Sequence, residues 1–405
     1  MRELLKQKVL WIAAFGYFVD LFDLVLYGSV RVTSLQSLGY QGKELFDVGA
    51  TLLNIQMAGM FVGGIFWGIL GDRRGRREAL FGSIFIYSFA TFLNAYVHDF
   101  SGYASLRFLA GIGLAGELGA AITLVSETLP PATRGLGSAF VASIGFLGAV
   151  ASSFVSQHIS WQNSYRVGGI IGFLLLLTRV SVKESILYLK THANNPGRSF
   201  GSFTLVFKSR RLLRTIALAF FAGVPIWYVA GILSYFAPEF AKELQISGTV
   251  TAGRSIMVGY LGSILGDIAC GLLSQKLKSR KKAVLYFMIG GGGIALFHPL
   301  FLTGATANWF YFIRFTIGFG IGFFAILIAW IAEMFGTNLR ATLTSTLANL
   351  IRASVIPLTL CFQIYNPSLG FLRTSAILGG VCFLFAVFAT LRLPETFSRD
   401  LHFLE

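Results

Sequence analysis

The chain has 405 residues, of which 55% are hydrophobic and only 13% are charged. A soluble protein carries about 25% charged residues, so this composition excludes an ordinary soluble domain. The net charge of +15 would suit a nucleic-acid-binding protein, but the basic residues gather in alternate loops, at 2–8, 73–77, 183–211 and 276–282. This positive-inside pattern predicts a membrane protein with both termini in the cytoplasm, and we expect no nucleic-acid partner.

Apolar segments long enough to cross the bilayer recur along nearly the whole chain, and the bilayer is therefore a partner. They are too long for barrel strands, so we expect helices. The first contains two aspartates and no small-residue cleavage site follows it, so it does not read as a cleaved signal peptide. The twelve predicted spans are 9–32, 46–70, 78–98, 102–126, 135–157, 165–180, 212–236, 253–274, 283–302, 307–331, 341–362 and 372–392.

These spans divide into two groups of six. Residues 1–180 form an expected N-terminal six-helix bundle, and residues 212–405 form a C-terminal one. Between them, 181–211 is basic and polar and contains the breaker run 194–197, Asn-Asn-Pro-Gly, so we expect a cytoplasmic linker there.

One residue pattern occurs in both halves. An arginine opens it, two glycines follow, and a glutamate precedes a second arginine by seven positions; the copies are Arg107, Gly111, Gly113, Glu127, Arg134 and Arg314, Gly318, Gly320, Glu333, Arg340. Duplicated halves in an apolar chain are typical of transporters that work by alternating access. We expect the two opening arginines to act in packing between the bundles, and the charged residues of both copies to act in gating.

A glycine-rich basic turn, 68–77, lies between the second and third segments. Its single acid, Asp72, can accept hydrogen bonds from arginines or from a neighbouring helix N-terminus. The turn resembles the loop signature of the major facilitator superfamily, which implies that it locks the cytoplasmic gate. A solvated turn is the alternative. The gating residues by this resemblance are Gly71, Asp72, Arg73, Gly75 and Arg76.

Three acids are predicted within the membrane. They are Asp20 and Asp23 in the first helix and Glu117 in the fourth. Tyr27 lies on the same face of the first helix as the two aspartates. A charged group there costs about 2.5–3.5 kcal/mol, so we predict that the acids bind the coupling proton; a structural hydrogen bond is the alternative. Asp23, Tyr27, Glu117, Glu127 and Arg134 together resemble the metabolite:proton symporter family within the superfamily, whereas Asp20 departs from that family's pattern.

A polar stripe on the eleventh helix contains Asn349 and Arg352. The repeat sets Phe146 opposite Arg352, so this charge is one-sided, which favours contact with a substrate or with an intramembrane acid. A structural salt bridge remains open. The other predicted substrate-binding residues, whose aromatic members are equally compatible with packing, are Tyr27, Asn54, Trp227 and Tyr228.

The sequence therefore predicts an all-α membrane protein with the major facilitator fold. We expect a proton-coupled symporter of the bacterial-type inner membrane, a monomer that imports a small organic solute, and a carboxylate-bearing one. A proton-antiport exporter is the alternative, although helix five lacks the proline typical of exporters between 143 and 153; a receptor or scaffold is a third. No metal site is predicted, because the cysteines lack metal-ligand spacing. No catalytic residue and no cofactor are predicted either.

Overall fold

The structure, a computed structural model, describes residues 7–129, 131–178, 209–336 and 338–397. Helices fill most of this part of the chain, as expected from its apolar segments. Each helix of the first half is continuous. They are α2 (Lys8–Ser37), α3 (Gly42–Arg74), α4 (Arg76–Asn94), α5 (Phe100–Thr128), α6 (Pro131–His158) and α7 (Trp161–Thr178).

The second half also forms six rods, but three of them are broken. The seventh rod is α10 (Arg210–Trp227), the π-helix η2 (Tyr228–Ser234) and α11 (Ala237–Glu243); the tenth is α14 (Ala307–Gly320) with α15 (Phe324–Met334); the eleventh is α16 (Arg340–Ala353) with α17 (Val355–Leu369). The unbroken rods are α12 (Ala252–Leu277), α13 (Arg280–Leu302) and α18 (Phe371–Arg392). In the described ranges, nine rods are long and apolar enough to span a membrane by composition alone.

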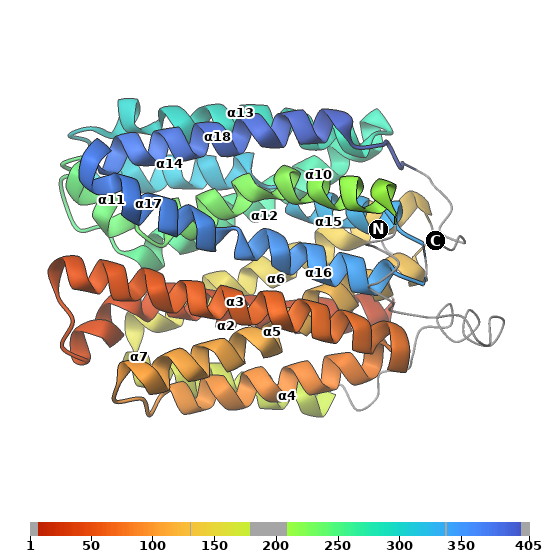
Figure 1. The fold of residues 1–405 in the computed structure, drawn as a ribbon, viewed down its shortest axis with the longest axis horizontal. Coiled ribbons are helices and arrows are strands. Elements are labelled where there is room, and N and C mark those ends of the chain that lie inside the picture. The colour runs from red at the N-terminus through yellow and green to blue at the C-terminus, as the bar shows by residue number, and fades with distance from the viewer. Residues whose placement is uncertain (1–6, 130, 179–208, 337, 398–405) are drawn as a thin grey trace.

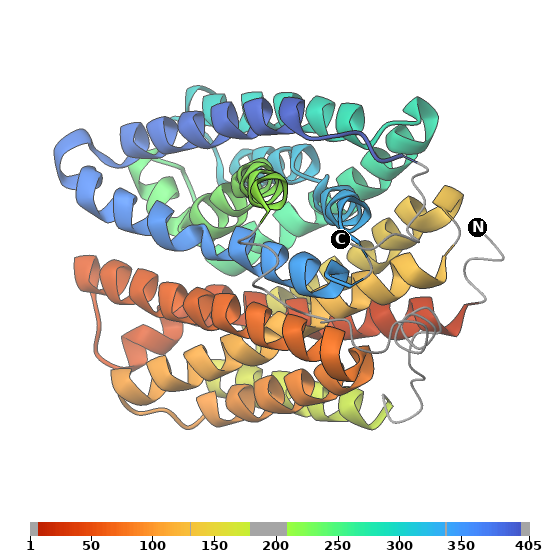
Figure 2. The ribbon, with the colours of Figure 1, turned by 45° about the vertical axis from the view of Figure 1, so that its right-hand side comes forward.

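The two halves form two layers of helices (Figures 1 and 2). The first half lies in one layer and the second in the other, with α3 packed along α16 and α6 along α12 where the layers meet. The start of α2, the α3–α4 turn and the end of α18 lie at one end of the molecule, which we call the basic end. The predicted all-α fold of twelve helices in two bundles is confirmed.

Two of the breaks in the second half lie next to prolines, and the third lies at a close contact with another helix. Pro225 in α10 and Pro357 near the start of α17 lack the N–H that would bond the carbonyl four residues earlier. The tenth rod is interrupted at 321–323, where Gly322 lies so close to α12 that an added Cβ would be 2.5 Å from the Cα of Gly266. The predicted spans 212–236, 307–331 and 341–362 are therefore each interrupted, and irregular backbone in a membrane protein tends to line cavities.

Candidate functional site

The three acids predicted within the membrane lie close together in the interior. Asp20 and Asp23 project from α2 and Glu117 from α5, and each side chain is at most 1% exposed. Asp20 interacts electrostatically with both of the others. The structure therefore confirms that these acids are buried and adjacent.

Asp20 forms an ion pair that crosses between the bundles. The Nη2 of Arg352, on α16, lies 3.2 Å from Oδ2 of Asp20, and both side chains are fully buried. Arg352 also donates from Nη1 to Oδ1 of Asn349 at 3.4 Å. Of the two partners considered for Arg352, a substrate or an intramembrane acid, this structure shows the acid.

Asp23 is neutralised inside the first bundle. Its Oδ1 accepts a 2.6 Å hydrogen bond from Thr91 on α4 and lies 3.9 Å from Nη2 of Arg107 on α5. Arg107 also reaches Gln56 on α3 and lies over the ring of Tyr165. Neutralising Asp23 would remove the counterion of Arg107, so the two charges are coupled.

A cavity lies between the bundles beside these pairs. It encloses about 610 Å³ of empty space, with open space at its mouth included. Aromatic and aliphatic side chains dominate its walls, and it reaches the π-helix and the break in the tenth rod. Its polar and aromatic lining residues are Tyr17, Phe146, Trp227, Ser234, Tyr260, Ser263, Arg314 and Phe324.

Asp72 closes the basic end by capping a helix of the other bundle. Its Oδ2 accepts hydrogen bonds from the backbone N–H and the hydroxyl of Thr342, in the first turn of α16. Of the two kinds of donor predicted for Asp72, the helix N-terminus is therefore one it uses. Nearer the cavity, Ser345 and Asn349 both donate to the carbonyl of Ala115 on α5. These contacts hold the bundles together on the basic side of the cavity.

The rest of the basic turn makes the geometry of this closure possible. Gly75 connects α3 to α4 with φ +109°, a conformation that favours glycine. Gly71 is buried and Arg73 is exposed. The side chains of Arg76, Glu127 and Arg134 lie outside the described part of the chain, so their predicted gating roles stay predictions.

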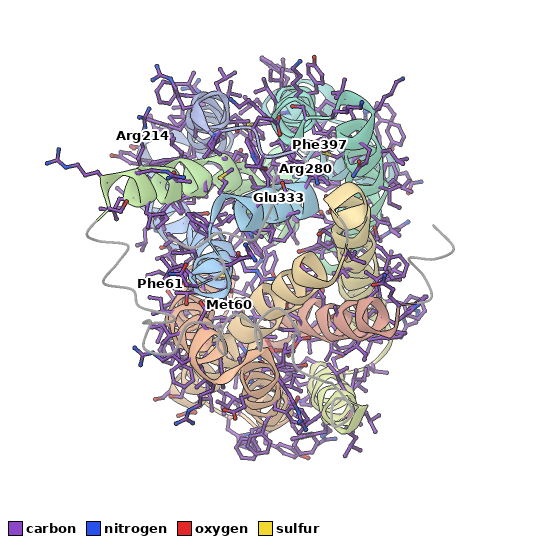
Figure 3. The ribbon with its side chains drawn as sticks, turned by 90° about the vertical axis from the view of Figure 1, so that its right-hand side faces the viewer. Met60, Phe61, Arg214, Arg280, Glu333 and Phe397 are labelled. Carbon is purple, nitrogen blue, oxygen red and sulfur yellow. The ribbon has the colours of Figure 1, made fainter. Side chains whose placement is uncertain are left out.

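The C-terminal segment after α18 builds a second polar cluster at the basic end (Figure 3). Glu333 accepts hydrogen bonds from Arg280, 3.0 Å away, and from Thr396. Glu395 accepts from the hydroxyl of Ser279 and from the N–H of Arg280. Partial burial alone would raise the pKa of Glu395, but these hydrogen bonds lower it below its usual value. The network ties α13, α15 and the C-terminal segment together.

Sequence reasoning missed the closure at the opposite end. Arg31, for which the sequence predicted no role, is a buried residue of α2. Its Nη2 lies 2.7 Å from Glu239 on α11. Nearby, Tyr235 donates to the carbonyl of Leu24. The two bundles are therefore in contact at both ends of the molecule.

The predicted substrate-binding residues are not all at the cavity. Trp227 lines it, whereas Tyr27 donates to the carbonyl of Gly49 and Tyr228 bonds to Ser375. Asn54 and Asn349 bond to Thr359 and Ala115 respectively, so each connects the two bundles. In this conformation these four residues act in packing and closure.

The opening arginines of the repeat also depart from expectation. We expected Arg107 and Arg314 to join the bundles, but the described polar and ring contacts of each lie within its own bundle. Arg314 instead lines the central cavity. Glu333 and Arg340, in contrast, lie at the basic end, where Arg340 donates to the carbonyl of Ala332.

Comparison with known proteins supports this architecture. The sequence model of the Major Facilitator Superfamily matches residues 13–359. The chain is 25% identical to the putative niacin/nicotinamide transporter NiaP of Bacillus subtilis, over 85% of this chain and 84% of that protein. It is 26% identical to the sialic acid transporter NanX of Escherichia coli, over 85% of this chain and 84% of that protein.

Solved structures share the fold at lower identity. The proton:xylose symporter XylE superposes with a TM-score of 0.75 and 15% identity, over 97% of both chains. The human organic anion transporter MFSD10 gives a TM-score of 0.72 and 14% identity, over 94% of this chain and 98% of that one.

Proposed function

Since the chain belongs to the major facilitator superfamily, and is a multi-pass membrane transporter and not an enzyme, we propose that it is a symporter that imports a small organic acid together with protons. The observation that carries the proposal is the set of three acids buried beside a cavity between two bundles. Burying an ionisable group in the membrane costs free energy, and such groups commonly mark the pathway of an ion or a substrate. The relatives' names, transporters of niacin and of sialic acid, support an organic acid as substrate.

In the proposed mechanism, protonation changes which charges are paired. A proton on Asp20 weakens its ion pair with Arg352 across the bundle interface, and a proton on Asp23 leaves Arg107 without its counterion. An unpaired buried charge disfavours the occluded state, so the carrier with only one of its two ligands crosses it less readily than the carrier with both. Coupling then follows from differential binding in the two open states.

The orientation proposed is that of the sequence analysis. The basic end faces the cytoplasm of a bacterial-type inner membrane, because basic loops stay on that side. The contact between Asp72 and Thr342 then closes the cytoplasmic gate, and the contact between Arg31 and Glu239 closes the outer gate. We propose that the protein works as a monomer, because one chain contains both bundles and the cavity.

The proposal is tested by uptake of organic acids into proteoliposomes with an imposed pH gradient. Asp23→Asn keeps the side-chain shape but cannot hold a transferable proton, so gradient-driven accumulation should be lost while binding without a gradient persists. Glu44→Gln, a change at an exposed acid of α3, is the control and should transport as the wild type does. Normal accumulation by Asp23→Asn would show that Asp23 is not the proton site. Efflux driven by an inward proton gradient would instead identify an exporter.

A further inference from the structure

Arg314 differs from the other buried arginines in the part of the chain that the structure describes. Each of the others has an oxygen acceptor, whereas none of the three guanidinium nitrogens of Arg314 has a hydrogen-bond partner there. The pairs of the others are Arg31 with Glu239, Arg107 with Asp23, Arg280 with Glu333, Arg340 with the carbonyl of Ala332, and Arg352 with Asp20.

The surroundings of Arg314 compensate its charge only weakly. Its side chain is 2% exposed, and its guanidinium carbon lies 4.7 Å from the ring centre of Phe310 and 5.3 Å from that of Phe240. Cation–π contacts contribute about 2 kcal/mol when desolvated, less than the cost of burying an unpaired charge. Among the described residues its titratable neighbours are Tyr228 and His298, and neither carries a carboxylate. An anion is therefore needed to complete the site.

The cavity provides the place for that anion. Arg314 lines it, and Trp227, also on its wall, has an indole N–H without an acceptor in the described ranges. A carboxylate accepts two parallel hydrogen bonds from a guanidinium fork and can accept a third from the indole. Aromatic rings form another part of the wall, where the ring centres of Phe146, in the first bundle, and Tyr260, in the second, are 5.3 Å apart. Such rings favour a flat apolar body.

The internal repeat gives an independent reason for the same assignment. Arg107 and Arg314 occupy equivalent positions in the two copies; among the described residues Arg107 has an acid, Asp23, beside it, and Arg314 has none. Arg352, the expected anion site, already pairs with Asp20. In the second bundle, then, no described residue supplies the counterion of the repeated arginine, and an anion from outside the protein can supply it.

We propose that Arg314, together with Trp227, binds the carboxylate of an aromatic carboxylic acid held in the central cavity. This deepens the proposed function and rests on it, because it names the class of the imported acid. Arg314 is then a substrate-binding residue, and substrate charge replaces the missing protein acid in the occluded state.

Equilibrium binding to the detergent-purified full chain tests the inference without any gradient. The probes are benzoate and its neutral analogue benzamide, which have nearly the same shape and differ in charge. The wild type should bind benzoate more tightly than benzamide. Arg314→Gln should weaken benzoate binding by about 10- to 100-fold, the usual range for a charged hydrogen-bonded contact, and leave benzamide binding unchanged. Arg314→Lys should be intermediate, since an ammonium lacks the fork geometry.

Arg166→Gln is the matched control. Arg166 belongs to α7, bonds to Asn163 and lies outside the cavity lining, so its loss should not affect either probe. If Arg314→Gln does not yield folded protein, Arg314→Lys is used for the test, and its preference for benzoate over benzamide should be smaller than that of the wild type. Equal binding of benzoate by the wild type and the Arg314 variants overturns the inference, as does a wild type that binds no benzoate or does not prefer it to benzamide.

The binding assay separates this inference from the proposed function. If benzoate binding depends on Arg314 but a pH gradient drives no uptake, the anion site stands and proton coupling fails. If uptake is proton-driven but insensitive to Arg314, coupling stands and the assignment of the carboxylate to Arg314 fails.

Discussion

The ion pair between Asp20 and Arg352 should make a large, non-additive contribution to stability. Both side chains are fully buried, and their closest charged atoms are 3.2 Å apart. Removing one partner of a buried pair leaves the other charge without compensation, which costs about 3–5 kcal/mol. We therefore expect Asp20→Asn and Arg352→Met each to destabilise the protein by about that amount.

The double variant should be much less destabilised than the sum of the two. With both charges gone, no buried charge remains uncompensated, and neutral replacements of a buried pair are often nearly harmless. Glu117 lies near Asp20, so Asp20→Asn also removes the repulsion between the two acids, which reduces the loss in that variant. We still expect a coupling free energy of about 2 kcal/mol or more, well above the roughly 0.5 kcal/mol scatter of independent sites.

The assay is an unfolding titration in mixed detergent micelles, applied to the wild type, both single variants and the double variant. Asp47→Asn combined with Arg352→Met is the control, because Asp47 accepts a hydrogen bond from Gln363 and has no described contact with Arg352. That combination should be additive. Additive effects in Asp20→Asn with Arg352→Met would refute the pairing on which closure across the bundles depends.

Two further predictions concern packing and pH. Gly318→Ala should lower the free energy of unfolding by about 1–3 kcal/mol, because the added Cβ would lie 2.0 Å from the carbonyl oxygen of Gly259 on α12. Gly290→Ala is the control and should not destabilise the protein, because nothing lies within 4 Å of its new atom. Equal unfolding midpoints for the two variants would contradict this packing. The lowered pKa of Glu395 means that its contribution is present above the ordinary pKa of a glutamate and is lost as the pH falls through the folded-state pKa. Glu395→Gln should therefore lower the unfolding temperature at neutral pH and reduce its decline in acid; parallel pH profiles for both proteins would refute it.

The fold was predictable because its main determinant is local. Each span is a run of apolar residues, and helix is the conformation that satisfies its backbone in lipid. The neighbourhood of Asp20 and Asp23 followed from a spacing of three residues on one helix. The breaks were less accessible: Pro225 and Pro357 are visible in the sequence, but the interruption at 321–323 depends on how closely Gly322 approaches another helix.

The partners of the charged residues were the part that sequence could not supply. Asp72 was expected to accept from arginines or from a helix N-terminus, and its partner Thr342, in the first turn of the helix that it caps, lies 270 positions later. The sequence predicted no partner for Arg31, because its acid, Glu239, lies 208 positions away. Arg314 was grouped with Arg107 because a repeat preserves residues without revealing their neighbours. Pairing depends on how the two bundles dock, and no local pattern encodes that.

The closures at the two ends differ in chemistry, which bears on how the carrier can alternate. At the basic end the bonds are those of a carboxylate to a helix N-terminus; at the opposite end they centre on the ion pair between Arg31 and Glu239. Each hydrogen bond contributes about 0.5–1.5 kcal/mol net, and those to charged groups about 1.5–3 kcal/mol, so opening either end costs several kcal/mol. A substrate carboxylate bound to Arg314 and a proton bound to Asp20 or Asp23 change the electrostatic free energy of the interior by amounts of the same size. Ligands bound between the gates can therefore decide which one opens, provided that they bind the two open states unequally.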